Sequence, residues 1–150
     1  GIHMKGYQDR VPVVVIGGRA GAFLGEYMAG GRLYVLGLTP PGGPVPAAAA
    51  PAPADGLAGR RGTRARSLTG FYTGTGMHGG VMYLRGEVDP HLVGKEVVIS
   101  PADEGDLEVI RADLADYAAC FGLDLEDILA AGFTRLAPKS HRPYGKNYAY

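Results

Sequence analysis

The chain has 150 residues, of which 15 are Lys or Arg and 15 are Asp or Glu, so its formal net charge is zero. A neutral chain has no electrostatic reason to bind nucleic acid or anionic lipid without sequence preference, and we expect neither partner. Its 25 glycines and 11 prolines approach the content of disordered chains, but 46% apolar residues indicate a folded core. No apolar run is long enough to cross a membrane.

Two features bear on the origin and compartment of the protein. Residues 1–4 lack the charged and apolar regions of a signal peptide, and we interpret them as a cloning scar ahead of a single domain over residues 5–150. Cys120 is the only cysteine, so the chain cannot form an internal disulfide or a four-cysteine metal site. We therefore expect a cytoplasmic protein, with Cys120 as a buried and inert thiol on a helix.

The first half of the chain contains an internal repeat. Residues 25–37 align without gaps on residues 74–86, and both read G-x-x-M-x-G-G-x-x-Y-x-x-G. The shared positions are Gly25, Met28, Gly30, Gly31, Tyr34 and Gly37 in the first copy, and Gly74, Met77, Gly79, Gly80, Tyr83 and Gly86 in the second. A shorter third copy, formed by Val13, Val14, Val15 and Ile16, stands 20 residues before residues 33–36. The repeat predicts stacked units of about 20 residues.

Short β-branched or aromatic runs that end in glycine are typical of strands joined by sharp turns. We therefore predict a mainly β fold, a short single-stranded right-handed β-helix (a solenoid), in which Tyr34 and Tyr83 join one side-chain ladder. Met28 and Met77 are expected to fill its core. Residues 5–12 are too short and polar to cover the first strand, so residues 13–16 are predicted to be an open edge for a partner or a second copy.

Residues 39–67 separate the two copies and account for the 49-residue spacing between Leu33 and Met82. They are rich in Pro, Ala and Arg, a composition with little to bury, so we predict a solvated loop insertion. The arginines of this segment either remain solvated or dock a partner; they are Arg60, Arg61, Arg64 and Arg66.

The glycines of the first copy allow a second interpretation. Residues 13–25 resemble a strand that enters a dinucleotide-binding loop, with Gly18 and Gly21 at the second and third fingerprint positions. Ile16 stands where the fingerprint needs its first glycine, and no acidic residue for a ribose ends the next strand. A small nucleotide-binding oxidoreductase that uses the loop from Gly17 to Gly21 is therefore kept as the alternative function.

Residues 103–132 are predicted to form a helical hairpin. Nine of the acidic residues lie between Asp103 and Asp127, and the apolar residues among them recur with the period of a helix. The first helix is predicted to have Asp106 as its N-cap and Gly122 as its C′ residue, and to bury the stripe Leu107, Ile110, Leu114, Tyr117 and Phe121. The second is predicted to start at Asp124, to turn Leu125, Ile128 and Leu129 inward, and to stop at Gly132. We expect the hairpin to cover an open end or face of the solenoid.

Residues 133–136 are predicted to be extended, and residues 138–150 to form an irregular tail. The tail alternates tyrosines with basic residues, among them Tyr144 and Lys146. Because the whole chain is neutral, we expect the tail to pack along its own domain or a neighbour rather than on nucleic acid.

No catalytic constellation can be assembled from the sequence. His78, His91 and His141 are scattered and lack a metal-ligand spacing, so we expect no metal, no cofactor and no catalysis by this chain alone. His78 stands where the first copy has Ala29, so it is either a surface residue or a function added to one copy.

The repeat and the ending resemble a known family. The motif, with Gly74-Thr-Gly76 leading its second copy, resembles the GXGXG right-handed β-helix domain at the C-terminal end of the glutamate synthase large subunit, and also one of the subunits of formylmethanofuran dehydrogenase. Residues 106–144 resemble the helices and tail of the stand-alone form of the glutamate synthase domain.

The resemblance implies a non-catalytic scaffold. Its implied partners are the amidotransferase part and the flavin and iron–sulfur part of an oxidoreductase complex for glutamate biosynthesis and nitrogen metabolism. A self-associating structural protein without such partners is the remaining possibility.

Overall fold

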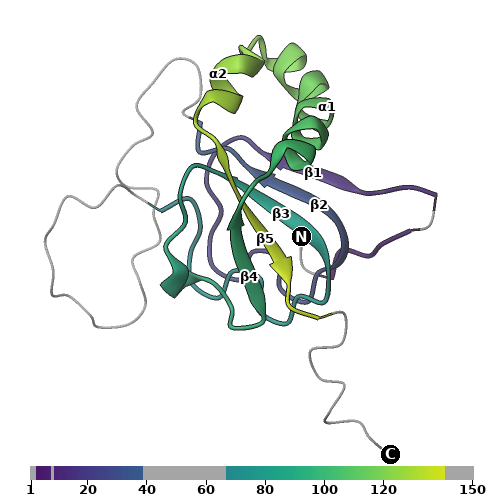
Figure 1. The fold of residues 1–150 in the computed structure, drawn as a ribbon, viewed down its shortest axis with the longest axis vertical. Coiled ribbons are helices and arrows are strands. Elements are labelled where there is room, and N and C mark those ends of the chain that lie inside the picture. The colour runs from purple at the N-terminus through teal and green to yellow at the C-terminus, as the bar shows by residue number, and fades with distance from the viewer. Residues whose placement is uncertain (1–2, 8, 39–66, 141–150) are drawn as a thin grey trace, which may run out of the picture.

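A computed structural model describes residues 3–7, 9–38 and 67–140 (Figure 1). In chain order the elements are β1 (Val13–Ile16), β2 (Ala29–Val35), β3 (Gly79–Arg85), a 3-10 turn (Pro90–Leu92), β4 (Val97–Pro101), α1 (Glu104–Phe121), α2 (Leu125–Ala130) and β5 (Phe133–Pro138). The insertion predicted at residues 39–67 lies outside the described residues except for Ser67, as does the tail from residue 141.

The five strands form one mixed sheet in the order β1-β2-β3-β5-β4. Strands β1, β2 and β3 run parallel, whereas β5 lies antiparallel to both β3 and β4. The predicted β-helix is therefore wrong, because this sheet is not closed or curled into a solenoid (Figure 1). The physical reason is β5: the chain returns from the helices in the opposite direction and takes the place beside β3 that the next parallel strand of a solenoid would need.

The repeat sets the register between β2 and β3. Tyr34 lies opposite Tyr83 and Leu33 opposite Met82, at the 49-residue spacing read from the sequence. The two tyrosine rings stack with centroids 5.3 Å apart and planes 22° apart, so the predicted ladder is confirmed.

The register of β1 differs from the prediction by one residue. Val14, and not Val13, lies opposite Leu33, which places Val15 beside Tyr34. Since successive side chains point to opposite faces, a one-residue slip exchanges the faces of a whole strand. The observed register packs Ile16 against the apolar cluster that contains Val35.

The first described residues belong to the fold. The carbonyl of Met4 accepts hydrogen bonds from the amides of Ala29 and Gly30, at 2.8 and 3.0 Å, and the Met4 side chain packs against the core. Residues expected to be a scar thus contribute backbone contacts to the start of β2.

The sheet carries one apolar cluster on each face, because alternate residues of a strand point to opposite sides. The first cluster contains Leu33, Met82 and Leu84 together with Met28 and Met77, and both of these methionines are fully buried as predicted. The second cluster lies between the sheet and the helices and is formed by Tyr34, Leu36, Tyr83, Ile110, Leu114, Ala118, Ile128 and Phe133.

Helix α1 begins three residues earlier than predicted. Asp103 is the N-cap, its carboxylate accepts from the amide of Asp106 at 2.8 Å, and Asp106 returns the contact to the amide of Asp103 at 3.1 Å. Asp106 is therefore the third helical residue of a capping box and not the cap itself. The helix ends as predicted at Gly122, with φ of 62°.

The buried face of α1 differs from the predicted stripe. Ile110, Leu114 and Ala118 are buried, whereas Leu107 and Phe121 are exposed. Cys120 is exposed too, so the prediction of a buried thiol is wrong. Two residues along a helix correspond to about 200°, so Ala118 turns toward the sheet and Cys120 away from it.

The second helix follows the prediction. Asp124 caps α2 through the amide of Glu126 at 2.8 Å, and Ile128 is buried. Neither helix in the described part of the chain combines the length and hydropathy that a membrane span needs.

Candidate functional site

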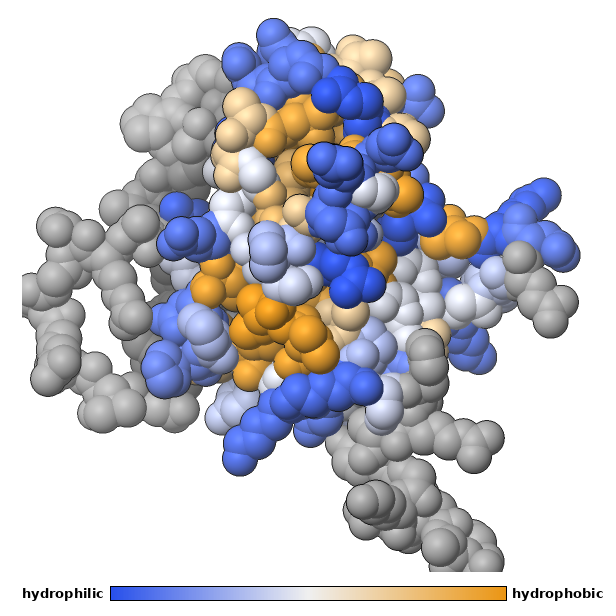
Figure 2. All heavy atoms as spheres, in the orientation of Figure 1, coloured by the Kyte–Doolittle hydropathy of each residue, from blue (hydrophilic) through white to orange (hydrophobic). Residues whose placement is uncertain are grey.

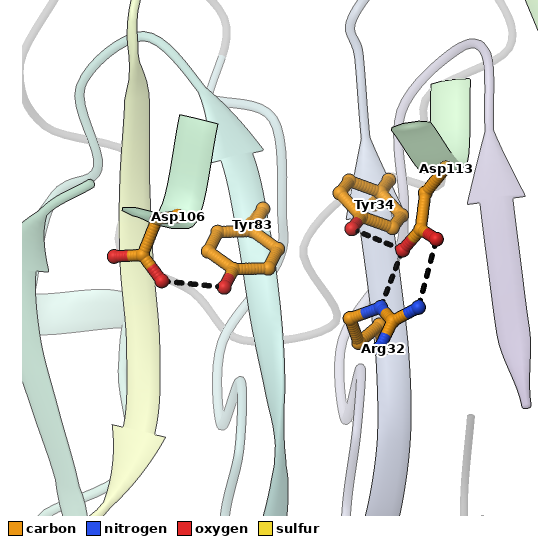
Figure 3. A network of polar contacts seen from close by, with 5 residues as sticks. All are labelled: Arg32, Tyr34, Tyr83, Asp106 and Asp113. Carbon is orange, nitrogen blue, oxygen red and sulfur yellow. Dashed lines mark hydrogen bonds and ion pairs between the residues drawn. The ribbon is translucent and has the colours of Figure 1, made fainter. Parts of the chain in front are cut away.

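Two tyrosine hydroxyls of the sheet hold helix α1 (Figure 3). On β3, Tyr83 donates a hydrogen bond of 2.6 Å to Asp106, and on β2, Tyr34 donates one of 2.6 Å to Asp113. Asp113 also accepts two hydrogen bonds from the Arg32 guanidinium, of which the Nη2 contact measures 2.8 Å. This Tyr–Asp network joins the sheet and the helix at two points.

The network fixes the direction of the helix. Asp106 contacts β3 through Tyr83 and β5 through Arg135, whose Nε lies 3.4 Å from the carboxylate. Farther along the helix, Asp113 contacts β2, and the Tyr117 hydroxyl lies against Gly17 just after β1. Helix α1 therefore crosses four strands of the sheet, in the order β5, β3, β2 and β1.

Burial and hydrogen bonding keep the hydroxyls of Tyr34 and Tyr83 protonated. Burial, with the Asp113 hydrogen bond second, raises the pKa of Tyr34 well above its usual value. The same causes, with Asp106 as the acceptor, raise the pKa of Tyr83 to about 12. Both phenols thus stay protonated donors at neutral pH, which suits a structural contact and not a nucleophile.

The short helix α2 is tied to β3 and α1. Arg85 of β3 donates to the carbonyls of Ile128 at 2.9 Å and Asp127 at 3.1 Å. These carbonyls lie near the C-terminus of the helix, where a cation is favourable. On the surface, Arg111 and Glu126 form an exposed ion pair between the two helices, which lowers the pKa of Glu126.

Gly30 and Gly79 occupy the same position of the repeat, and both lie close to the backbone of a neighbouring segment. A Cβ on Gly79 would lie 2.1 Å from the carbonyl oxygen of Ala29, and one on Gly30 would lie 2.3 Å from backbone atoms of Gly6. Real Cβ atoms never approach backbone so closely, so any side chain there would push neighbouring segments apart.

Other repeat glycines provide the turns. Gly31 and its equivalent Gly80 have φ of 82° and 74°, in the left-handed region that costs other residues about 1 to 2 kcal/mol. Positive φ angles also occur at Gly25, Gly37, Gly74 and Gly86.

Three aromatic rings contact one another on the loops that precede β2 and β3, and a fourth, Tyr27, lies on the same loop as Phe23 with its ring against His3. We call this surface the aromatic rim; it consists of Phe23, Tyr27, Phe71 and Tyr72, whose exposures range from 40% to 59%. The rings of Phe23 and Tyr72 stack with centroids 5.0 Å apart and planes 20° apart, and Phe71 lies 6.3 Å from Tyr72. The loops themselves are joined, since the amide of Phe23 donates to the carbonyl of Phe71 at 2.9 Å.

Three rim residues occupy a strained backbone conformation. Phe23, Tyr27 and Tyr72 have φ of 61°, 50° and 64°, although glycine would adopt this region without cost. Strain of this kind costs on the order of 1–3 kcal/mol per residue and gathers at active sites, ligand clamps and switch regions. The aromatic rim is therefore the best candidate for a binding surface on the described part of the molecule.

The predicted edge is formed by β1. Val13 and Val14 are 39% and 37% exposed, while Val15 and Ile16 are partly covered by the two clusters. A second apolar area lies over β4, where Val98 and Ile99 are exposed (Figure 2). The β1 edge and the aromatic rim are separate features, on a strand and on loops.

The loop from Gly17 to Gly21 lacks the geometry of a dinucleotide site. A fingerprint loop opens a helix whose N-terminus holds the pyrophosphate, but residues 17–28 contain turns and no helix. Gly17 instead makes room for Tyr117, because a Cβ there would lie 2.1 Å from the Tyr117 hydroxyl oxygen.

The histidines do not form a site in the described residues. The Nδ1 atom of half-buried His78 lies 3.1 Å from the carbonyl oxygen of Gly76, within its own turn. Among residues 3–7, 9–38 and 67–140, no three His, Cys, Asp or Glu side chains are placed to hold a metal ion.

Sequence reasoning missed the rim and the polar network for different reasons. The rim could have been found, because extending the repeat upstream places Phe23 and Tyr72 at the same 49-residue spacing. The role of Arg32 was not predicted, because the equivalent residue of the second copy is Val81 and the position is therefore not part of the motif. Asp106 and Asp113 carried a weak signal, since residues seven apart share one face of a helix.

Comparisons with known proteins agree with the motif. The family model described as "GXGXG motif" matches residues 2–140. An uncharacterized protein of Methanocaldococcus jannaschii, MJ1350, is 40% identical over 152 residues, which cover 99% of this chain and 50% of the relative. The chain thus spans about half the length of this curated relative. Since the family model matches nearly the whole chain, the protein belongs to the GXGXG motif family.

Proposed function

We propose that the chain is a non-catalytic structural domain or subunit of a glutamate synthase-like complex. In this role it holds an amidotransferase part and a flavin and iron–sulfur part in a fixed relation. Family membership supports the proposal, as does the resemblance of the motif and ending to the stand-alone domain of glutamate synthase. The similar subunit of formylmethanofuran dehydrogenase is, on the same resemblance, a related scaffold.

The observation that carries the proposal is the aromatic rim. Aromatic residues are enriched at the centres of protein interfaces, because they bury much apolar area with few rotatable bonds. Phe71 and Tyr72 are more than half exposed, and Tyr72 holds a strained backbone conformation. A surface of this kind suits a protein partner, whose contact would bury the rings.

A scaffold also needs a rigid base, and the Tyr–Asp network supplies one. The sheet and α1 are joined by charge-assisted hydrogen bonds at Asp106 and Asp113. Hydrogen bonds to charged groups are stronger than neutral ones, and these are largely shielded from water. The rim lies on loops that are bonded to each other and lead directly into β2 and β3.

Co-expression with the amidotransferase and the flavin and iron–sulfur subunits of the same genome tests the proposal. Size-exclusion chromatography with light scattering should show one complex that contains the chain. We expect glutamine-dependent glutamate formation to require the chain, and ammonia-dependent formation to proceed without it. Failure of the chain to enter any such complex would contradict the proposal.

A matched pair of variants separates the rim from general surface effects. Phe71→Ser with Tyr72→Asn removes two exposed rings, and asparagine tolerates the positive φ of position 72. Phe121→Ser removes another exposed ring, 61% accessible, from the end of α1. In size-exclusion chromatography the first variant should elute apart from the complex, and the second should elute with it. If both variants elute in the same way, the rim is excluded as the docking surface.

A further inference from the structure

The outer side of β1 is an unpaired strand edge. Strand β1 is the first strand of the sheet, and its residues Val13, Val14, Val15 and Ile16 include no charged side chain. Apolar edges without charge, proline or bulge are templates for pairing with another strand. The other edge, β4, is blunted, because it ends in Pro101, which has no N–H to donate.

The hydrogen bonds to β2 show which groups of β1 point outward. The carbonyls of Pro12 and Ile16 accept from the amides of Arg32 and Leu36, at 2.8 and 2.9 Å. Alternate residues of a strand face opposite neighbours, so Val14 also faces β2, and the N–H and C=O groups of Val13 and Val15 point away from it. Within the described residues, no segment pairs with these outward groups.

We propose that β1 pairs antiparallel with β1 of a second copy of this chain, around a two-fold axis that passes through Val14. In this register Val13 of one copy lies opposite Val15 of the other, and each pair exchanges two backbone hydrogen bonds. The two pairs satisfy all four outward groups on each copy. The result is one continuous sheet across two chains, and the inference does not depend on the proposed function.

The charges on the two flanks of β1 favour the same antiparallel arrangement. Asp9 and Arg19 stand five residues before and after Val14, on the two flanks of β1, so the two-fold axis brings the flank with Asp9 of each copy toward the flank with Arg19 of the other. Both side chains are exposed, and neither has an ion-pair partner within the described part of the chain. A shift of the two strands by one residue is excluded, because it would set outward backbone groups of one copy opposite inward groups of the other.

Helix α1 contacts the end of β1 and not the position of the proposed axis. The Tyr117 hydroxyl lies beside Gly17, three residues or about 10 Å along the strand from Val14. The two-fold axis therefore sets the two Tyr117 contacts about 20 Å apart on the same face of the joined sheet. The two helices therefore contact the joined sheet at separate points.

Cysteine cross-linking tests both the dimer and its register. All variants carry Cys120→Ser, because Cys120 is exposed and could cross-link by itself. Val14→Cys places two cysteines across the axis with Cα atoms about 4.5 Å apart, which a disulfide can span. In Val13→Cys the corresponding atoms are about 8 Å apart, beyond that range. We expect at least about tenfold more disulfide-linked dimer from the Val14→Cys variant than from the Val13→Cys variant in a glutathione redox buffer.

Charge exchange gives an independent readout by sedimentation equilibrium. The unmodified chain, 15.7 kDa as a monomer, should reach twice that mass at about 100 µM. Arg19→Asp should weaken the dimer by about tenfold at low salt, and Asp9→Arg combined with Arg19→Asp should restore it. The control Lys95→Asp makes the same change of charge at an exposed residue just before β4, at the other edge of the sheet, and should change the dissociation constant by less than about twofold.

Three outcomes would overturn the inference. A chain that remains a 15.7 kDa monomer at about 100 µM, and whose Val14→Cys variant forms no disulfide-linked dimer, does not pair through β1, whatever else covers that edge. Equal cross-linking from positions 13 and 14 would exclude an axis at Val14. A double charge exchange that fails to restore the dimer would exclude the contact between Asp9 and Arg19.

Discussion

The rings of Tyr34 and Tyr83 stack 5.3 Å apart, yet their hydroxyls bind aspartates that are seven residues apart on α1. Seven helical residues span about 10.5 Å, roughly twice the distance between the rings. The stack follows from the backbone pairing of β2 with β3, while the two hydroxyl contacts position the helix over these strands at two points. One motif position, the tyrosine, thus joins the repeat to the non-repeating half of the chain.

Stability should fall above pH 10. The pKa of Tyr83 in the folded protein is about 12 and that of Tyr34 is raised further, whereas an unfolded tyrosine titrates near 10. The stabilisation is complete below pH 10 and is lost as the pH rises toward 12, because only the unfolded chain releases these protons. The slope approaches about 2.7 kcal/mol per pH unit for two groups. Urea unfolding at pH 9 to 11.5 measures it, and Tyr34→Phe with Tyr83→Phe should flatten the curve.

Removal of the Asp113 carboxylate should destabilise the protein by about 3 kcal/mol. In Asp113→Ala the buried Tyr34 hydroxyl loses its acceptor and Arg32 loses its ion-pair partner. Asp116→Ala, on the exposed side of the same helix, is the control and should change stability by less than about 0.5 kcal/mol. Similar values for both variants in urea unfolding would show that the network does not hold the helix.

Gly79→Ala should be among the most damaging single substitutions. The new methyl group would lie 2.1 Å from the carbonyl oxygen of Ala29, so β2 and β3 must separate, at a cost we expect to exceed about 3 kcal/mol. Gly18→Ala is the matched control, because nothing lies within 4 Å of its Cβ position and its φ is not positive. Its stability should stay within about 1 kcal/mol of the parent by thermal unfolding. A folded Gly79→Ala with unchanged melting would contradict the close packing.

Tyr72→Gly should cost little stability and much partner binding. Glycine relieves the strain at φ of 64°, about 1–2 kcal/mol, and this gain offsets the loss of ring stacking against Phe23, about 0.5–1.5 kcal/mol. Chemical denaturation should therefore show a change within about 1 kcal/mol. Loss of the synthase-like complex in the same variant would show that the ring is kept for binding, whereas a large destabilisation would give it a structural role.

Nicotinamide and flavin nucleotides should not stabilise the chain. A ligand at a hundredfold its dissociation constant adds about 2.7 kcal/mol to stability, which a thermal-shift titration detects readily. The loop from Gly17 to Gly21 opens no helix and packs against Tyr117, so it presents no phosphate cradle. A saturable shift with NAD(P)H or FAD would revive the oxidoreductase interpretation.

The accuracy of the sequence predictions follows the range of the interactions involved. The stacking of Tyr34 on Tyr83, the end of α1 at Gly122 and the cap of α2 at Asp124 were predicted, because each depends on local chemistry or on the repeat itself. The start at Asp106 was wrong, since Asp103 offers the same side chain three residues earlier and completes a capping box. Both residues are aspartates, so only the hydrogen bonds of the folded chain show that Asp103 is the N-cap and Asp106 the third residue of the helix.

By itself, the sequence determined the parallel pairing of residues 32–35 of β2 with residues 81–84 of β3, because the 49-residue repeat sets equivalent residues beside each other there. Only the tertiary structure decided that β5 enters antiparallel beside β3, which makes the sheet open and mixed. The direction of β5 depends on where the chain re-enters the sheet after the two helices. That return is set by contacts of Asp106 and Asp113 with distant strands, which no local pattern encodes.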